Sequence, residues 1–108
     1  MAAQALLDYE SLTDLELAGY FAAKDVRAVR LVTARNNQRL FRTAWSILKN
    51  RSEAEDVVQE TYLRALGAIG RFEGRSSLST WLTRIAINEA LTRKRAQQRR
   101  ANAFNEKS

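Results

Sequence analysis

The chain has 108 residues, a formal net charge of +6 and neither cysteine nor histidine. A single domain of this length can bury one modest core, and the two missing residue types exclude disulfides, thiolate zinc sites and Ser-His or Cys-His catalysis. We therefore expect no metal, no cofactor and no enzyme activity. Apolar runs fall short of the roughly 20 residues of a membrane span, and no secretory signal is visible, so we expect a cytoplasmic protein.

Charge alternates in blocks along the chain. Residues 1–23 contain four acidic and no basic residues, whereas residues 24–51 contain eight basic residues and one acidic residue. Residues 52–70 are again acidic, and residues 71–100 are again basic. The overall basic balance favours a polyanionic partner.

The chain is rich in helix-forming residues, contains no proline and shows no period-two alternation, so we expect an all-α fold, a compact bundle of three to four helices. Residues 1–24 would hold an acidic N-terminal helix, with Ser11 as its N-cap and Asp14 as the reciprocal acid. After Asp25, one long helix is favoured over two helices joined near Asn36 and Asn37. Its apolar stripe comprises Val26, Val29, Leu40, Phe41, Ala44, Trp45 and Leu48.

The segment AEDVVQETYLRAL, residues 54–66, predicts a third helix that opens at a capping box of Ser52 and Glu55 and ends at Gly67 or Gly70. Its predicted core stripe is Ala54, Val57, Val58, Tyr62, Ala65, Leu66 and Ile69. The opposite face displays Asp56, Gln59, Glu60, Leu63 and Arg64. On the residues alone, solvated surface is favoured over a docking site. The acids at the helix start complement its macrodipole, which is a commoner role than metal binding.

A loop over residues 71–79 combines Phe72, two arginines and several serines, and Thr80 and Trp81 follow it. Aromatic rings stack on bases and arginines pair with phosphates, so this composition suits single-stranded nucleic acid. The alternative is purely structural. Phe72 would then attach the loop to the core, and the serines would cap the next helix.

Ser77 or Ser79 would cap a fourth helix, whose inner stripe includes Leu78, Trp81 or Leu82, Ile85 and Leu91. Arg84, Asn88, Thr92 and Arg95 share one face at helical spacing, a row suited to contacts with bases and phosphates. A solvated basic helix end is the alternative. Residues 99–108 are expected to form a frayed tail.

Three signals follow one another along the chain: the helix AEDVVQETYLRAL, the glycine-containing loop after Phe72, and the helix STWLTRIAINEAL with its basic end. In this order they resemble region 2 of bacterial RNA polymerase sigma factors of the extracytoplasmic-function (ECF) group. The resemblance covers residues 25–96 and implies a region 2 domain at residues 25–98, followed by the start of a linker. No segment resembles the region 4 domain that reads the −35 element. The implied function is to bind core RNA polymerase and to recognise and melt the promoter −10 element during transcription initiation.

The resemblance also assigns roles to residues. The β′ clamp helices of the polymerase would dock on Asp56, Gln59, Glu60, Leu63 and Arg64. The non-template single strand would place a flipped base in the loop, at Phe72, Arg75, Ser76, Ser77 and Ser79. The following helix would hold the DNA through Thr80, Trp81, Arg84, Asn88, Arg93 and Arg95, and the basic face of residues 27–42 would add upstream phosphate contacts. An anti-sigma factor is a further implied partner.

Two features depart from related sequences. Housekeeping sigma factors carry paired tryptophans where this chain has Trp81 followed by Leu82, so melting should depend more on the captured base. Thr92 and Leu78 stand where an acid and an aromatic residue are frequent in the ECF group, which leaves the promoter sequence open. A different class of function is a helical adaptor or regulator whose acidic face binds a protein. Such an adaptor would show no DNA preference.

Overall fold

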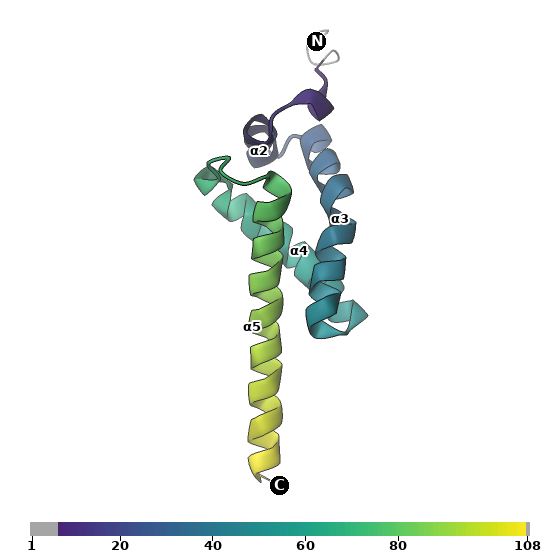
Figure 1. The fold of residues 1–108 in the computed structure, drawn as a ribbon, viewed down its shortest axis with the longest axis vertical. Helices are drawn as coiled ribbons and strands as arrows, with labels where there is room; N and C mark the ends of the chain where they lie inside the picture. Colours follow the sequence, from purple (N-terminus) through teal and green to yellow (C-terminus); the bar gives the residue numbers. More distant parts are fainter. Residues whose placement is uncertain (1–6, 108) are drawn as a thin grey trace.

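The structure, a computed structural model, describes residues 7–107, and these form helices without any strand. Three long helices pack against one another in pairs, and a short helix covers one end of the group (Figure 1). The predicted all-α bundle is confirmed. The elements in chain order are η1 (Tyr9–Ser11), α2 (Asp14–Ala22), α3 (Val26–Leu48), α4 (Arg51–Ala68), η2 (Ile69–Arg71) and α5 (Leu78–Lys107).

The N-terminal helix begins two residues later than expected. Thr13 is the N-cap of α2, and its capping box is reciprocal: the Glu16 N–H donates to the Thr13 hydroxyl, and the Thr13 N–H donates to the Glu16 carboxylate. The hydrogen bond from the Thr13 backbone lowers the pKa of Glu16. The predicted Ser11 cap is wrong because Ser11 belongs to the preceding 3-10 turn. Asp14 is not part of this capping box, and its carboxylate contacts the start of α5 instead.

The segment after Asp25 forms one continuous helix of 23 residues, as predicted. The Asp25 carboxylate accepts hydrogen bonds from the N–H groups of Arg27 and Ala28 and from the Tyr9 hydroxyl at 2.8 Å. The Ala28 N–H contributes most to lowering the pKa of Asp25, and the Tyr9 hydroxyl comes next. Asp25 therefore caps α3 and also attaches η1 to it.

The buried stripe of α3 differs from the predicted one. Val26 and Trp45 are 61% and 43% exposed. The stripe follows every fourth residue and contains small side chains, because α4 and α5 both pack closely on α3. Its members are Ala28, Val32, Asn36, Leu40 and Ala44.

Asn50 caps α4 by accepting a hydrogen bond from the Glu53 N–H at 2.9 Å, so the predicted cap of Ser52 with Glu55 is wrong. Thr61 is fully buried although the predicted stripe omits it. Its hydroxyl donates to the Val57 carbonyl at 2.7 Å, which satisfies the polar group inside the core. Ala54, Val57, Ala65 and Ile69 are buried as predicted, whereas Val58, Tyr62 and Leu66 are half-buried at the edges.

Ser77 caps α5, since its hydroxyl oxygen accepts the Thr80 N–H at 3.0 Å. Of the two alternatives for the core, Leu82 is fully buried and Trp81 is only partly buried. The predicted fraying of residues 99–108 is wrong for residues 99–107, where α5 continues and extends beyond the other helices (Figure 1). Alanine, glutamine and charged residues with high helix propensity continue the helix there. Within residues 7–107 no helix has the length and apolar character needed to cross a membrane.

Candidate protein and nucleic-acid interfaces

The outer face of α4 carries Asp56, Gln59 and Leu63 on the surface, with Leu63 64% exposed. Glu60 lies beside them and is half-buried. Helical periodicity predicted that this face is exposed. The opposite side of the helix is buried and consists of alanine, valine and threonine. The result is one isolated leucine surrounded by acidic and amide groups.

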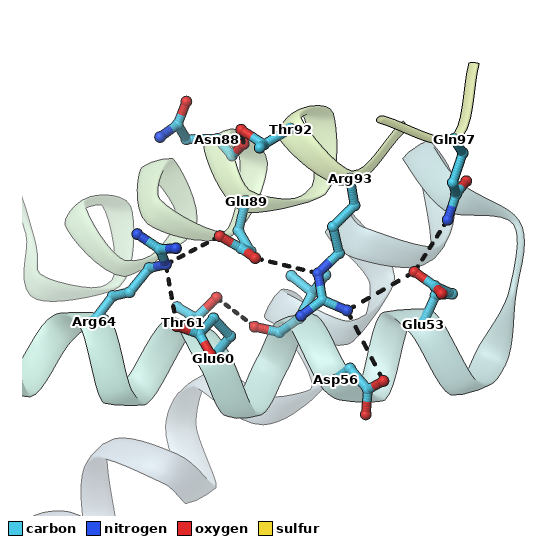
Figure 2. A network of polar contacts seen from close by, with 11 residues as sticks. Glu53, Asp56, Glu60, Thr61, Arg64, Asn88, Glu89, Thr92, Arg93 and Gln97 are labelled. Atoms are coloured by element: carbon cyan, nitrogen blue, oxygen red, sulfur yellow. Dashed lines mark hydrogen bonds and ion pairs between the residues drawn. The ribbon is translucent and has the colours of Figure 1, made fainter. Parts of the chain in front are cut away.

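An ion-pair network joins α4 to α5, and Glu89 is at its centre (Figure 2). The Glu89 side chain is 12% exposed, pairs with Arg64 Nε at 3.0 Å and accepts a hydrogen bond from Arg93 Nε at 3.2 Å. Arg64 also pairs with Glu60 at 3.3 Å. Arg64, predicted as part of the docking face, is therefore shared between the α4 surface and the contact with α5.

The other end of the network is built around Arg93. Its Nη1 lies 3.8 Å from Glu53 and 3.9 Å from Asp56, and Gln97 donates to Glu53 at 3.1 Å (Figure 2). Arg93 therefore points toward α4 and is held by three carboxylates. The structure separates it from the row of α5 residues with which it was predicted to bind DNA.

A polar depression lies beside the loop that precedes α5. Phe72 is 7% exposed, and its ring centroid lies 5.5 Å from that of Trp81. This places Phe72 in the core as the attachment of the loop, with Trp81 nearer the surface. The depression is lined by Arg71, Phe72, Glu73, Arg75, Ser76, Trp81 and Arg84.

Ser77, Ser79 and Thr80, which were predicted to contact DNA, do not line this depression. Ser77 accepts the Thr80 N–H and donates to the Thr80 hydroxyl at 2.9 Å, so both side chains serve the helix cap. The Ser79 carbonyl accepts from the Thr83 hydroxyl within α5. Arg71 also lines the depression although it was not among the predicted site residues, and it lies directly before Phe72 in the same basic block.

A second depression shares Trp81 and Arg84 with the first and continues between α4 and α5 to Asn88. Asn88 is exposed, and its carbonyl accepts the Thr92 hydroxyl at 2.8 Å. Arg95 is exposed further along the helix. Of the α5 residues predicted to contact DNA, Trp81, Arg84 and Asn88 therefore flank one continuous surface that begins at the loop.

A third depression lies between α3 and α4, next to the outer face of α4. The Tyr62 hydroxyl donates to the Asn37 side chain at 2.6 Å across it, and burial raises the pKa of Tyr62 to about 12. Phe41 and Gln59 line the same hollow. The polar face of α4 is thus continuous with a partly apolar groove on α3.

A family model described as Sigma-70 region 2 matches residues 32–100. The chain belongs to the sigma-70 region 2 family. The predicted family is confirmed. The matched segment of this region 2 domain contains all of α4, the loop with its depression, and α5 as far as Arg100.

Curated relatives of this region 2 domain include ECF sigma factors. RNA polymerase sigma-H factor of Pseudomonas aeruginosa is 34% identical over 87 residues, which cover 81% of this chain and 45% of that protein. ECF RNA polymerase sigma-E factor of Haemophilus influenzae is 35% identical over 91 residues, 84% of this chain and 48% of that protein. The chain thus spans about half the length of these relatives.

A solved structure similar to this domain is the NMR structure of an engineered region 2 of sigmaE in complex with GTAAAA. The two folds agree with a TM-score of 0.70 at 33% sequence identity. The match covers 84% of this chain and 95% of that one. The folds therefore agree over almost the whole of the solved domain.

Proposed function

We propose that this domain binds core RNA polymerase through the outer face of α4 and recognises and melts the promoter −10 element through the loop and α5. It acts in the cytoplasm by binding rather than by catalysis. The observation that carries the DNA part is the depression in which Trp81 packs on Phe72 beside Arg71, Arg75 and Arg84. An aromatic wall with three cations and one acid around it suits a base attached to phosphates.

Base capture has to offset the free energy of unstacking. Extracting a base costs a few kcal/mol, and stacking on an aromatic side chain returns about 1–3 kcal/mol per base. Trp81 is the available stacking surface because Phe72 is buried beneath the loop. We expect Arg75, whose side chain is 85% exposed, and Arg84, which lines the same depression, to pair with phosphates of the strand.

The DNA surface continues from Trp81 along α5 to Asn88 and Arg95. Arg93 belongs to the contact between the helices, so we assign it to holding α5 against α4. This leaves the strand to contact the exposed side of α5. The basic residues on α3 from Arg27 to Arg42 are proposed as upstream phosphate contacts.

The polymerase part of the proposal rests on Leu63. An exposed apolar side chain ringed by polar groups matches the anatomy of a small docking patch, with an apolar centre and a polar rim. Gln59 and Glu60 form the rim on the same helix face. The proposed polymerase contact is the clamp helices of its β′ subunit. An anti-sigma factor would act by covering this face and the DNA surface together.

The DNA proposal is tested by fluorescence anisotropy with labelled six-nucleotide single strands that include GTAAAA, the strand in the complex of the engineered relative. Trp81→Ala should weaken binding about tenfold through the loss of one stacking surface. Trp45→Ala is the matched control, since Trp45 is an exposed tryptophan on α3. Equal affinities for the two variants would reject Trp81 as the stacking residue.

The polymerase proposal is tested by binding of the labelled domain to core enzyme. The double variant Gln59→Ala, Leu63→Arg should lose binding, whereas Val26→Ala, which trims an exposed aliphatic residue on α3, should bind as the native chain does. Asp56 is left intact because it faces Arg93 across the helix contact. Binding of a protein partner without any preference for DNA would instead support the adaptor.

A further inference from the structure

The short helix α2 contacts the start of α5 directly. The Leu78 N–H, at the first residue of α5, donates to the Asp14 carboxylate at 2.8 Å. The two residues are 64 positions apart in sequence, and Leu78 is 3% exposed. A free N–H at a helix start needs an acceptor, and a negative charge there is favourable. Asp14 supplies both from another helix.

Helix α2 also lies beside the middle of the loop. Gly74 has a φ of +76°, and a Cβ added to it would lie 3.8 Å from the Cβ of Leu15 in α2. Helix α2 also packs against η2, the turn that leads into Phe72. Helix α2 therefore packs against the turn before the loop, lies beside the middle of the loop and accepts a hydrogen bond at its end.

Helix α2 is itself firmly anchored. Leu17 and Phe21 are 1% and 2% exposed and belong to the same core as Leu82 and Phe72. Its start is held by the reciprocal capping box of Thr13 and Glu16. An anchored helix can pass its position to the loop through Asp14 and Leu15.

The residues that line the depression fall on the two sides of this support. Arg75 and Ser76 lie in the loop between Gly74 and Leu78, whereas Trp81 and Arg84 lie in the first two turns of α5. The hydrogen bond to Leu78 is at the junction of these two groups. A change in that junction alters the distance between the aromatic wall and the loop arginine.

We propose that α2 braces the base-binding depression, with Asp14 as a positioning residue that holds the loop and the start of α5 in the conformation that accepts a base. This inference rests on the proposed function. The brace lies outside residues 32–100, the segment that the family model matches.

The test compares Asp14→Ala with Glu10→Ala in the full chain. Both remove one carboxylate, but Glu10 is exposed on η1 beside Arg27 and Arg30, so its loss leaves the loop contacts intact. Binding of GTAAAA is measured against a six-unit abasic strand, which keeps the phosphates and lacks the bases. Asp14→Ala should lose about tenfold of the base-dependent preference, the equivalent of one charge-assisted hydrogen bond. Glu10→Ala should keep the preference.

Hydrogen exchange at the Leu78 amide in the DNA-free protein gives a second readout that does not depend on DNA binding. Exchange should be faster in Asp14→Ala than in Glu10→Ala. Equal exchange in the two variants, or an unchanged base preference in Asp14→Ala, overturns the brace. Absence of any base preference in the native chain overturns the proposed function instead, and exchange at Leu78 then still decides whether the contact holds the loop.

Circular dichroism establishes that each variant is folded at the assay temperature. If Asp14→Ala is unfolded there, Leu15→Ala decides the matter, because it keeps the hydrogen bond and removes the part of the Leu15 side chain beyond Cβ, which lies beside Gly74. A partial loss of base preference in Leu15→Ala supports the brace. An unchanged preference overturns it.

Discussion

The outer face of α4 and the depression beside the loop differ in how many segments build them. The α4 face is one side of a single helix, and its residues stand in place as soon as that helix forms. The depression combines η2, the loop and the first turns of α5, and α2 supports it from 64 residues away. A surface on one helix thus depends on local sequence, whereas a depression shared by several segments depends on contacts between distant parts of the chain.

Changes in the core should damage the depression before they damage the α4 face, because only the depression requires several helices in fixed relative positions. Changes on the outer face of α4 should leave the depression intact. The experiments that follow test this separation.

The largest effect is expected from Leu82→Ala. Leu82 lies on α5 and is fully buried in the core, so its truncation should lower the free energy of unfolding by about 2–5 kcal/mol. Leu63→Ala, the same substitution at an exposed leucine, should change it by less than about 0.5 kcal/mol. Urea unfolding monitored by circular dichroism measures both. Similar losses in the two variants would contradict the assigned core.

Glu89→Ala should follow in size. It leaves Arg64 and Arg93 without their shared carboxylate, and we expect a loss of about 1–3 kcal/mol in unfolding free energy. Glu55→Ala also removes one negative charge, but from an exposed side chain, so it should lower the free energy of unfolding far less. The measurement is again urea unfolding, and equal costs would show that the network does not stabilise the contact between α4 and α5.

Arg75→Ala should affect binding and leave stability unchanged, because its ion pair with Glu73 is long and largely exposed to solvent. Titrations of GTAAAA at several salt concentrations should give a log-log slope smaller by about 0.7, the loss of one phosphate contact on a single strand. Arg51→Ala, an exposed arginine at the start of α4, is the control. The same change of slope in both variants would indicate general charge attraction rather than a loop contact.

Tyr62→Phe is expected to have the smallest effect at neutral pH, about 1 kcal/mol or less for one hydrogen bond to Asn37. Burial raises the pKa of Tyr62 to about 12 in the folded protein, above the ordinary value of 10.0. Its contribution to stability is therefore complete below pH 10 and is lost as the pH rises toward 12. The native chain should lose more stability than Tyr62→Phe over this range. If the native chain and Tyr62→Phe lose stability in parallel over this range, the pKa of Tyr62 does not differ between the folded and unfolded states.

Much of the architecture follows from local sequence signals. High helix propensity, the absence of proline and the periodic apolar positions predict the long helix after Asp25, the helix of AEDVVQETYLRAL and its exposed outer face. These features depend on residues three or four positions apart, which a single helix brings together whatever surrounds it. The family resemblance rests on the same local segments, and the family match confirms it.

Tertiary structure decided which side chains meet. It selected Thr13 over Ser11 and Asn50 over Ser52 as caps, and it buried Asn36 and Thr61 while leaving Trp45 at the surface. Local capping patterns were satisfied by more than one candidate, and close helix packing favours small side chains over large apolar ones.

Two pairings illustrate what the sequence alone did not determine. Arg93 pairs with the carboxylates of α4, and Asp14 accepts a hydrogen bond from the start of α5. Periodicity states which face of a helix is polar, but it does not state which polar group on another helix will lie opposite. Only the packing of α2, α4 and α5 supplies those partners, because they are distant along the chain and are brought together by burial of a shared core.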